Sequence, residues 1–70
     1  MFPNIRSEMA KNNVIQMDIA TALNKSVTTV SRMLSGKAPI SLDEAKIIKS
    51  VINTDLPLEE LFKTETEARR

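Results

Sequence analysis

Two short helical segments that stand three residues apart constrain this fold more than any other feature of the sequence. The first spans 16–23, and the second follows an N-cap at Ser26 and runs to 34. Each is about two turns long and carries apolar residues at helical spacing. Helices this short, joined this tightly, cannot lie antiparallel. We therefore predict that they cross steeply and pack through one small contact.

A steep crossing sets requirements at particular positions of the two segments. The crossing point needs a small residue facing an aliphatic one, and Ala20 and Val30 fit these roles. The turn needs a residue that tolerates a positive φ angle, and Asn24 is the best choice after glycine. Ser26 is a favourable N-cap, and Gly36 stands just past the second helix, where a left-handed residue ends helices. These matches predict a crossed helix pair over 16–36.

Three further helices are predicted around this pair, which makes the fold all-α. The first spans about 3–12, with Pro3 in its first turn, where a missing N–H costs nothing. Ser41 and Glu44 form a capping box that opens a helix ending at 52. Pro57 opens a short last helix over 58–62. The apolar stripe predicted for the capped helix comprises Leu42, Ala45, Ile48, Val51 and Ile52.

The five helices are predicted to form one domain over 1–62. The segment 63–70 is polar apart from Ala68 and is predicted to be a C-terminal tail. The four methionines are predicted to fill gaps in the core.

The composition excludes several classes of function. The chain has no cysteine and no histidine, which removes disulfides, thiol nucleophiles, the usual zinc sites and imidazole catalysis. The carboxylate pairs at 43–44 and 59–60 fall in first turns of helices, where capping and the helix dipole explain them. We expect neither an enzyme nor a cofactor. Without a membrane-length apolar run or a signal-peptide pattern, the chain is expected to be cytoplasmic.

Charge is distributed unevenly along the chain. Residues 1–37 hold five basic and two acidic residues, whereas 38–70 hold five basic and seven acidic ones, although the overall net charge is only +1. Such an asymmetry is expected where one face of a protein meets phosphates and another faces away from them.

The stretch from Gln16 to Lys37 resembles the helix-turn-helix of Cro/cI-type (XRE) phage and bacterial transcription regulators. The resemblance extends over about 4–62 and implies a compact, five-helix, lambda-repressor-like domain that binds double-stranded DNA. The chain departs from the family pattern at four positions. Ile15 replaces a Thr or Ser cap, Asn24 replaces the turn glycine, Lys25 replaces an aliphatic residue, and Leu34 replaces a frequent glutamate.

The resemblance also implies which residues meet DNA, with the second helix of the pair in the major groove. Four residues would face base edges: Val27, Thr28, Ser31 and Arg32. Five would contact phosphates: Gln16, Ser26, Thr29, Ser35 and Lys37. The methyl groups of Val27 and Thr28 suit a thymine methyl, and the Arg32 guanidinium suits the O6/N7 pair of guanine. The same residues would also suit an ordinary solvent-facing helix. At Val27 this interpretation and a base contact are equally well supported by the sequence.

Several partners and functions stay open at this point. A Cro/cI-like repressor usually acts as a dimer on a palindromic operator, and a weak homodimer would use Leu56, Leu58 and Phe62. The chain could also be the N-terminal domain of a longer repressor. Alternatively, the fold could act by protein contact, as a phage antirepressor or corepressor that binds another phage regulator. Binding that weakens steeply with salt would favour DNA over a protein partner.

Overall fold

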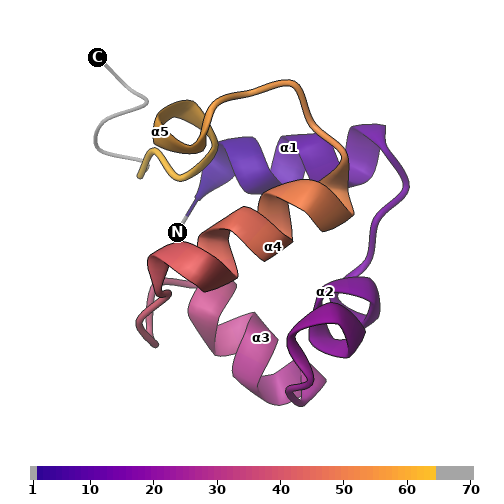
Figure 1. Cartoon of the computed structure of the whole chain (residues 1–70), viewed down its shortest axis with the longest axis vertical. Helices are drawn as coiled ribbons and strands as arrows, with labels where there is room; N and C mark the ends of the chain where they lie inside the picture. The colour runs from indigo at the N-terminus through magenta and orange to yellow at the C-terminus, as the bar shows by residue number, and fades with distance from the viewer. Residues whose placement is uncertain (1, 65–70) are drawn as a thin grey trace.

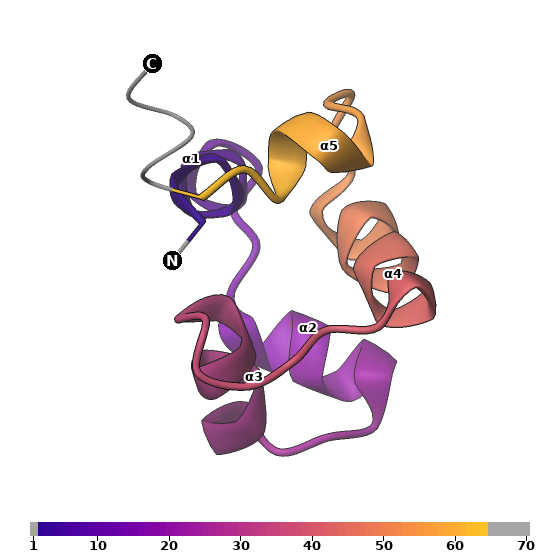
Figure 2. The ribbon, with the colours of Figure 1, turned by 90° about the vertical axis from the view of Figure 1, so that its left-hand side faces the viewer.

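A computed structural model describes residues 2–64 and contains five helices and no strand within that range, which confirms the all-α prediction (Figures 1 and 2). The helices are α1 (Pro3–Lys11), α2 (Gln16–Leu23), α3 (Val27–Leu34), α4 (Leu42–Ile52) and α5 (Leu58–Leu61). α1 and α5 each end one residue before their predicted ends. The predicted boundary between domain and tail stays a prediction, and 65–70 lie outside the described residues.

Local chemistry explains where the helices begin and end. Pro3 occupies the first turn of α1. At α4, the Glu44 N–H donates to the Ser41 hydroxyl at 3.2 Å, and the Ser41 N–H donates to the Glu44 carboxylate at 2.9 Å, which is the predicted capping box. Three asparagines that follow helices have positive φ angles: Asn13 (57°), Asn24 (56°) and Asn53 (58°). Asparagine tolerates this left-handed conformation better than most residues, so it ends helices here in place of glycine.

The core draws residues from all five helices. Its fully buried members are Ile5, Ile19, Ala20, Val30, Met33, Ile48, Ile52 and Leu61. In Figure 1, α1 and α5 lie above α4 and the α2–α3 pair lies below it, and Figure 2 shows α4 on the opposite side of the molecule from α1. Because α4 contacts both α2 and α5, its buried isoleucines join the two halves of the domain.

Two residues predicted to be in the core are exposed instead. Leu42 is 64% exposed, although it continues the stripe of Ile48 and Ile52, because it is the first residue of α4 and lines a groove at the surface. Met17 is 55% exposed. It precedes Ile19 by two positions, and at about 100° per residue it projects from nearly the opposite side of α2.

Side-chain contacts hold the two ends of the described chain together. The Asn4 amide donates to the Glu60 carbonyl at 2.6 Å, and the rings of Phe2 and Phe62 pack edge to face with centroids 5.5 Å apart. These contacts fix α1 against α5. As a result, α1 stands above the α2–α3 pair in a defined position, as Figure 2 shows.

Candidate nucleic-acid interface

The crossing of α2 and α3 matches the requirements that the sequence indicated. Ala20 is 2% exposed, Val30 is completely buried, and both belong to one apolar cluster. Asn24 adopts the left-handed conformation expected of it, and the next N–H, that of Lys25, donates to the Ala20 carbonyl at 3.0 Å. This turn lets α3 leave α2 at a steep angle (Figure 2). One face of α3 therefore packs inward while another projects from the molecule.

The outward face of α3 carries the strongest candidates for base contacts. Thr28 and Arg32 are both exposed and stand four residues apart, so they are neighbours on one helix face. Ser31, one residue before Arg32, is half-buried. Val27 is also half-buried because it packs against the core, so only part of its side chain reaches the surface.

Hydrogen bonds at the start of α3 fix two predicted phosphate-binding residues. The Ser26 hydroxyl accepts from the Thr29 N–H at 3.1 Å, as an N-cap does, and donates its own proton to the Thr29 hydroxyl at 3.0 Å. Thr29 thus keeps its hydroxyl proton for another acceptor. Ser26 therefore orients Thr29, and the Thr29 hydroxyl is the group that can donate to a phosphate.

The end of α3 turns sharply and presents Lys37. The Lys37 N–H donates to the Arg32 carbonyl at 2.8 Å, and Gly36 has a φ angle of 81°, a conformation that favours glycine. Lys37 is exposed. The Ser35 hydroxyl donates to the Ser31 carbonyl at 2.8 Å, so Ser35 can donate to a phosphate only by giving up this bond.

Gln16 lies at the start of α2, where backbone N–H groups are available to an anion. Ile15 has no side-chain oxygen to accept from them, and the Asp18 carboxylate instead accepts from the Ile15 N–H at 3.0 Å. Gln16 and Ser35, from α2 and α3, line the same cavity of 140 Å³. Arg6 of α1 lines it too. Sequence reasoning missed Arg6, because nothing in its own helix indicates that α1 folds over the crossed pair.

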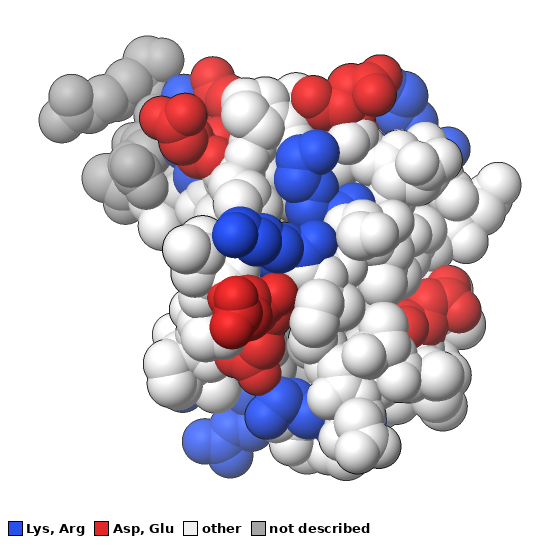
Figure 3. Space-filling view, in the orientation of Figure 1, with Lys and Arg blue, Asp and Glu red and all other residues white. Residues whose placement is uncertain are grey.

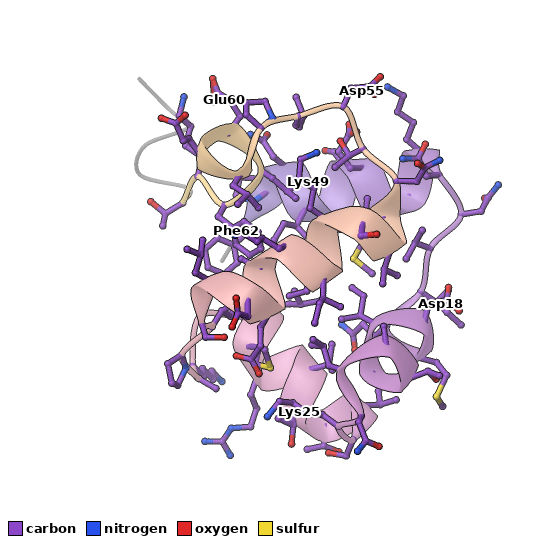
Figure 4. The ribbon with its side chains drawn as sticks, viewed as in Figure 1. Asp18, Lys25, Lys49, Asp55, Glu60 and Phe62 are labelled. Atoms are coloured by element: carbon purple, nitrogen blue, oxygen red, sulfur yellow. The ribbon has the colours of Figure 1, made fainter. Side chains whose placement is uncertain are left out.

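Ion pairing differs between the interface and the face over α4. Lys25, in the turn, lies 3.4 Å from the Glu44 carboxylate (Figure 4). Basic and acidic side chains intermix on the face that carries α4 (Figure 3). Within residues 2–64, by contrast, Arg32 and Lys37 form no ion pair. Their positive charges are therefore available to a polyanion.

The Glu44 carboxylate fixes the turn of the crossed pair to the start of α4. The pKa of Glu44 is lowered first by the hydrogen bond from the Ser41 N–H, and further by the Ser41 hydroxyl and the Lys25 ammonium, against an opposing effect of burial. The carboxylate therefore stays ionised at neutral pH, and both the cap and the ion pair weaken only as the pH falls through this lowered pKa.

Among residues 2–64, no three carboxylates come together in a group that could hold a metal ion. No helix described in this range has the length and apolar character needed to cross a bilayer.

Comparison with known proteins identifies the arrangement. The family model described as helix-turn-helix matches residues 5–58, from the first half of α1 to the start of α5. The match therefore includes the whole crossed pair and α4. Neither a curated protein nor a solved structure matches the chain.

Proposed function

The chain belongs to the Cro/cI (XRE) type of helix-turn-helix family, whose members are DNA-binding transcription regulators, and from this premise we propose that it is a Cro/cI-like repressor. In this proposal α3 enters the major groove of a double-stranded operator. The observation that carries the proposal is the exposed pair Thr28 and Arg32 on the outward face of α3, between polar groups at both ends of that helix. The family is one of regulatory domains and not of enzymes.

The proposed base contacts follow from side-chain chemistry. Arg32 donates two hydrogen bonds to O6 and N7 of guanine, which is worth about 1–3 kcal/mol of discrimination when bidentate. The methyl group of Thr28 meets a thymine methyl, and the exposed part of Val27 extends this apolar contact. Ser31 is half-buried beside Arg32 and contributes a weaker polar contact.

The proposed phosphate contacts flank α3 and set its depth in the groove. Thr29 donates its hydroxyl proton while Ser26 holds it in place. Ser35 and the exposed Lys37 contact the backbone beyond the end of α3, and Gln16 contacts it from the start of α2. These groups read no sequence, but they orient the side chains that do.

A selection experiment tests this function. The protein is incubated with random double-stranded oligonucleotides, and the bound fraction is sequenced. We expect enrichment of a short half-site, with affinity that falls steeply as the salt concentration rises. Failure to enrich any motif would contradict the proposal and favour contact with another protein, such as a second phage regulator.

Lys37→Ala is expected to weaken binding to all DNA sequences by the same factor. Lys37 is exposed, and the turn that presents it is held through its backbone N–H, which the substitution keeps. The slope of log K against log salt should become shallower by about one unit, because one phosphate contact is lost. Filter binding at several salt concentrations measures both effects. A change in base preference would contradict the role assigned to Lys37.

We also propose that two copies associate on a palindromic operator, through a surface at α5. Leu58 and Phe62 line an apolar groove that also contains Leu42. Leu56 lines a different, polar cavity and is not part of this groove. Leu42 is exposed beside this groove. Two copies related by a two-fold axis could each insert Leu42 into the groove of the other, so the surface can pair with itself.

Leu42→Glu is expected to abolish cooperative binding of two copies while leaving the fold intact. Leu42 is 64% exposed, so a glutamate there stays solvated in the monomer, but it would be buried and unpaired in the dimer. Gel-shift titration on a full palindrome and on a single half-site separates a loss of cooperativity between two copies from a loss of DNA binding by one copy. Ile47→Glu, at another exposed apolar residue of α4 that does not line the groove, is the matched control. Equal losses from both substitutions would contradict this dimer.

A further inference from the structure

One cavity brings together polar side chains from three helices beside the crossed pair. It has a volume of 140 Å³, and its polar lining comes from Arg6 of α1, Gln16 of α2 and Ser35, the residue that caps the end of α3. The rest of its lining is apolar: Phe2, Ile5, Met9 and Leu34. Figure 2 shows why these helices meet, since α1 lies above α3 on the side of the molecule away from α4. Among residues 2–64, no carboxylate lines the cavity.

Only two of these side chains have donors to offer. The Ser35 hydroxyl already donates to the Ser31 carbonyl at 2.8 Å. Within residues 2–64, neither the Arg6 guanidinium nor the Gln16 amide has a hydrogen-bond or ion-pair partner. A guanidinium has five N–H donors, an amide has two, and neither group has a carboxylate here to satisfy it. The cavity therefore has the donors and the positive charge to bind an oxyanion.

We propose that Arg6 and Gln16 bind the same backbone phosphate of DNA, so that α1 is part of the DNA interface. This inference rests on the proposed function, because it concerns the phosphate assigned to Gln16. The planar fork of an arginine suits two oxygens of one phosphate, and Gln16 binds that group from the other helix. Arg6 is exposed and Gln16 is half-buried, so the phosphate approaches from the surface.

The shared phosphate gives α1 a positioning role. α1 carries no residue of the groove-facing surface, and a phosphate contact reads no sequence. A phosphate held between α1 and α2, next to the end of α3, would fix the distance between α3 and the DNA backbone. Arg6 therefore acts on affinity and on the placement of α3, and not on base preference.

Lys11 offers a matched control for Arg6. It is an exposed cation of the same helix, but it lines a different cavity together with Glu8 and Asp55. Arg6→Ala and Lys11→Ala thus remove the same charge from two different positions of α1. We expect Arg6→Ala to weaken DNA binding about tenfold at low salt and to reduce the salt slope by about one unit. Lys11→Ala should leave the slope unchanged, and circular dichroism melting should show that both variants are folded.

A second arm of the experiment locates the phosphate. Operator duplexes that carry a single neutral methylphosphonate are tested at each backbone position. At one position the neutral group replaces the shared phosphate. On that duplex neither Arg6→Ala nor Gln16→Ala should weaken DNA binding any further. If the two losses disappear at different positions, or if Arg6→Ala and Lys11→Ala have equal slopes, the inference is overturned while the proposed function stands. If the unsubstituted protein binds no DNA, the proposed function itself fails, and the inference with it.

Discussion

Ile48→Ala is expected to remove about half of the stability of this domain. Ile48 is completely buried at the middle of α4, the helix that contacts both α2 and α5. Truncating a buried isoleucine to alanine costs about 2–5 kcal/mol, because the transfer free energy is lost and a cavity remains. A chain of 70 residues has a total free energy of unfolding of roughly 4–10 kcal/mol. The substitution therefore removes about half of the free energy that keeps the domain folded.

Ile47→Ala is the matched control for this prediction. The neighbouring isoleucine has the same side chain in the same helix but is 38% exposed. Its truncation leaves no closed cavity, and we expect a loss of about 1 kcal/mol or less. Urea denaturation followed by circular dichroism measures both free energies of unfolding. Losses of equal size would show that α4 does not pack as described.

The crossed pair and the start of α4 could be predicted from sequence because the interactions that form them are local. The left-handed turn at Asn24, the hydroxyl cap at Ser26 and the capping box of Ser41 and Glu44 involve residues at most four positions apart. Such interactions form in the same way wherever the segment lies in the fold. The burial of Ala20 and Val30 then followed from the steep crossing that this short turn imposes.

Other features depend on which element covers which, and the sequence does not display this. Leu42 lies on the predicted stripe of α4 but is exposed, because it lines a groove at the surface instead of the core. Val27 packs partly against the core, although it begins a helix. Arg6 shares a cavity with Gln16 only because α1 folds back over the crossed pair. Helical periodicity gives the direction in which a side chain points, whereas its neighbours come from residues far along the chain.

The ion pair between Lys25 and Glu44 depends on both kinds of information. The capping role of Glu44 is local, but its second partner comes from the turn between α2 and α3. The family pattern often has an aliphatic residue at the position of Lys25, so this chain connects its turn to α4 with a charge instead. The Glu44 carboxylate neutralises the charge of Lys25. Arg32 and Lys37 are therefore the basic residues of the described chain that remain unpaired at α3 and its C-terminal turn, the surface proposed to face the groove.

Arg32→Ala is expected to relax base preference at one operator position and to weaken binding to the best sequence by about 1–3 kcal/mol, or roughly 5- to 150-fold. The fold should not change, because the side chain is exposed and only the Arg32 carbonyl, which the substitution keeps, holds the turn that follows α3. Arg32→Lys separates charge from geometry: it should restore affinity for nonspecific DNA but not the preference for guanine, since a lysine lacks the planar fork. Selection from random oligonucleotides with each variant measures the preference, and Lys37→Ala serves as the reference for a uniform loss. Equal weakening on every sequence by Arg32→Ala would make Arg32 a phosphate contact and leave Thr28 as the main exposed base-reading residue of α3.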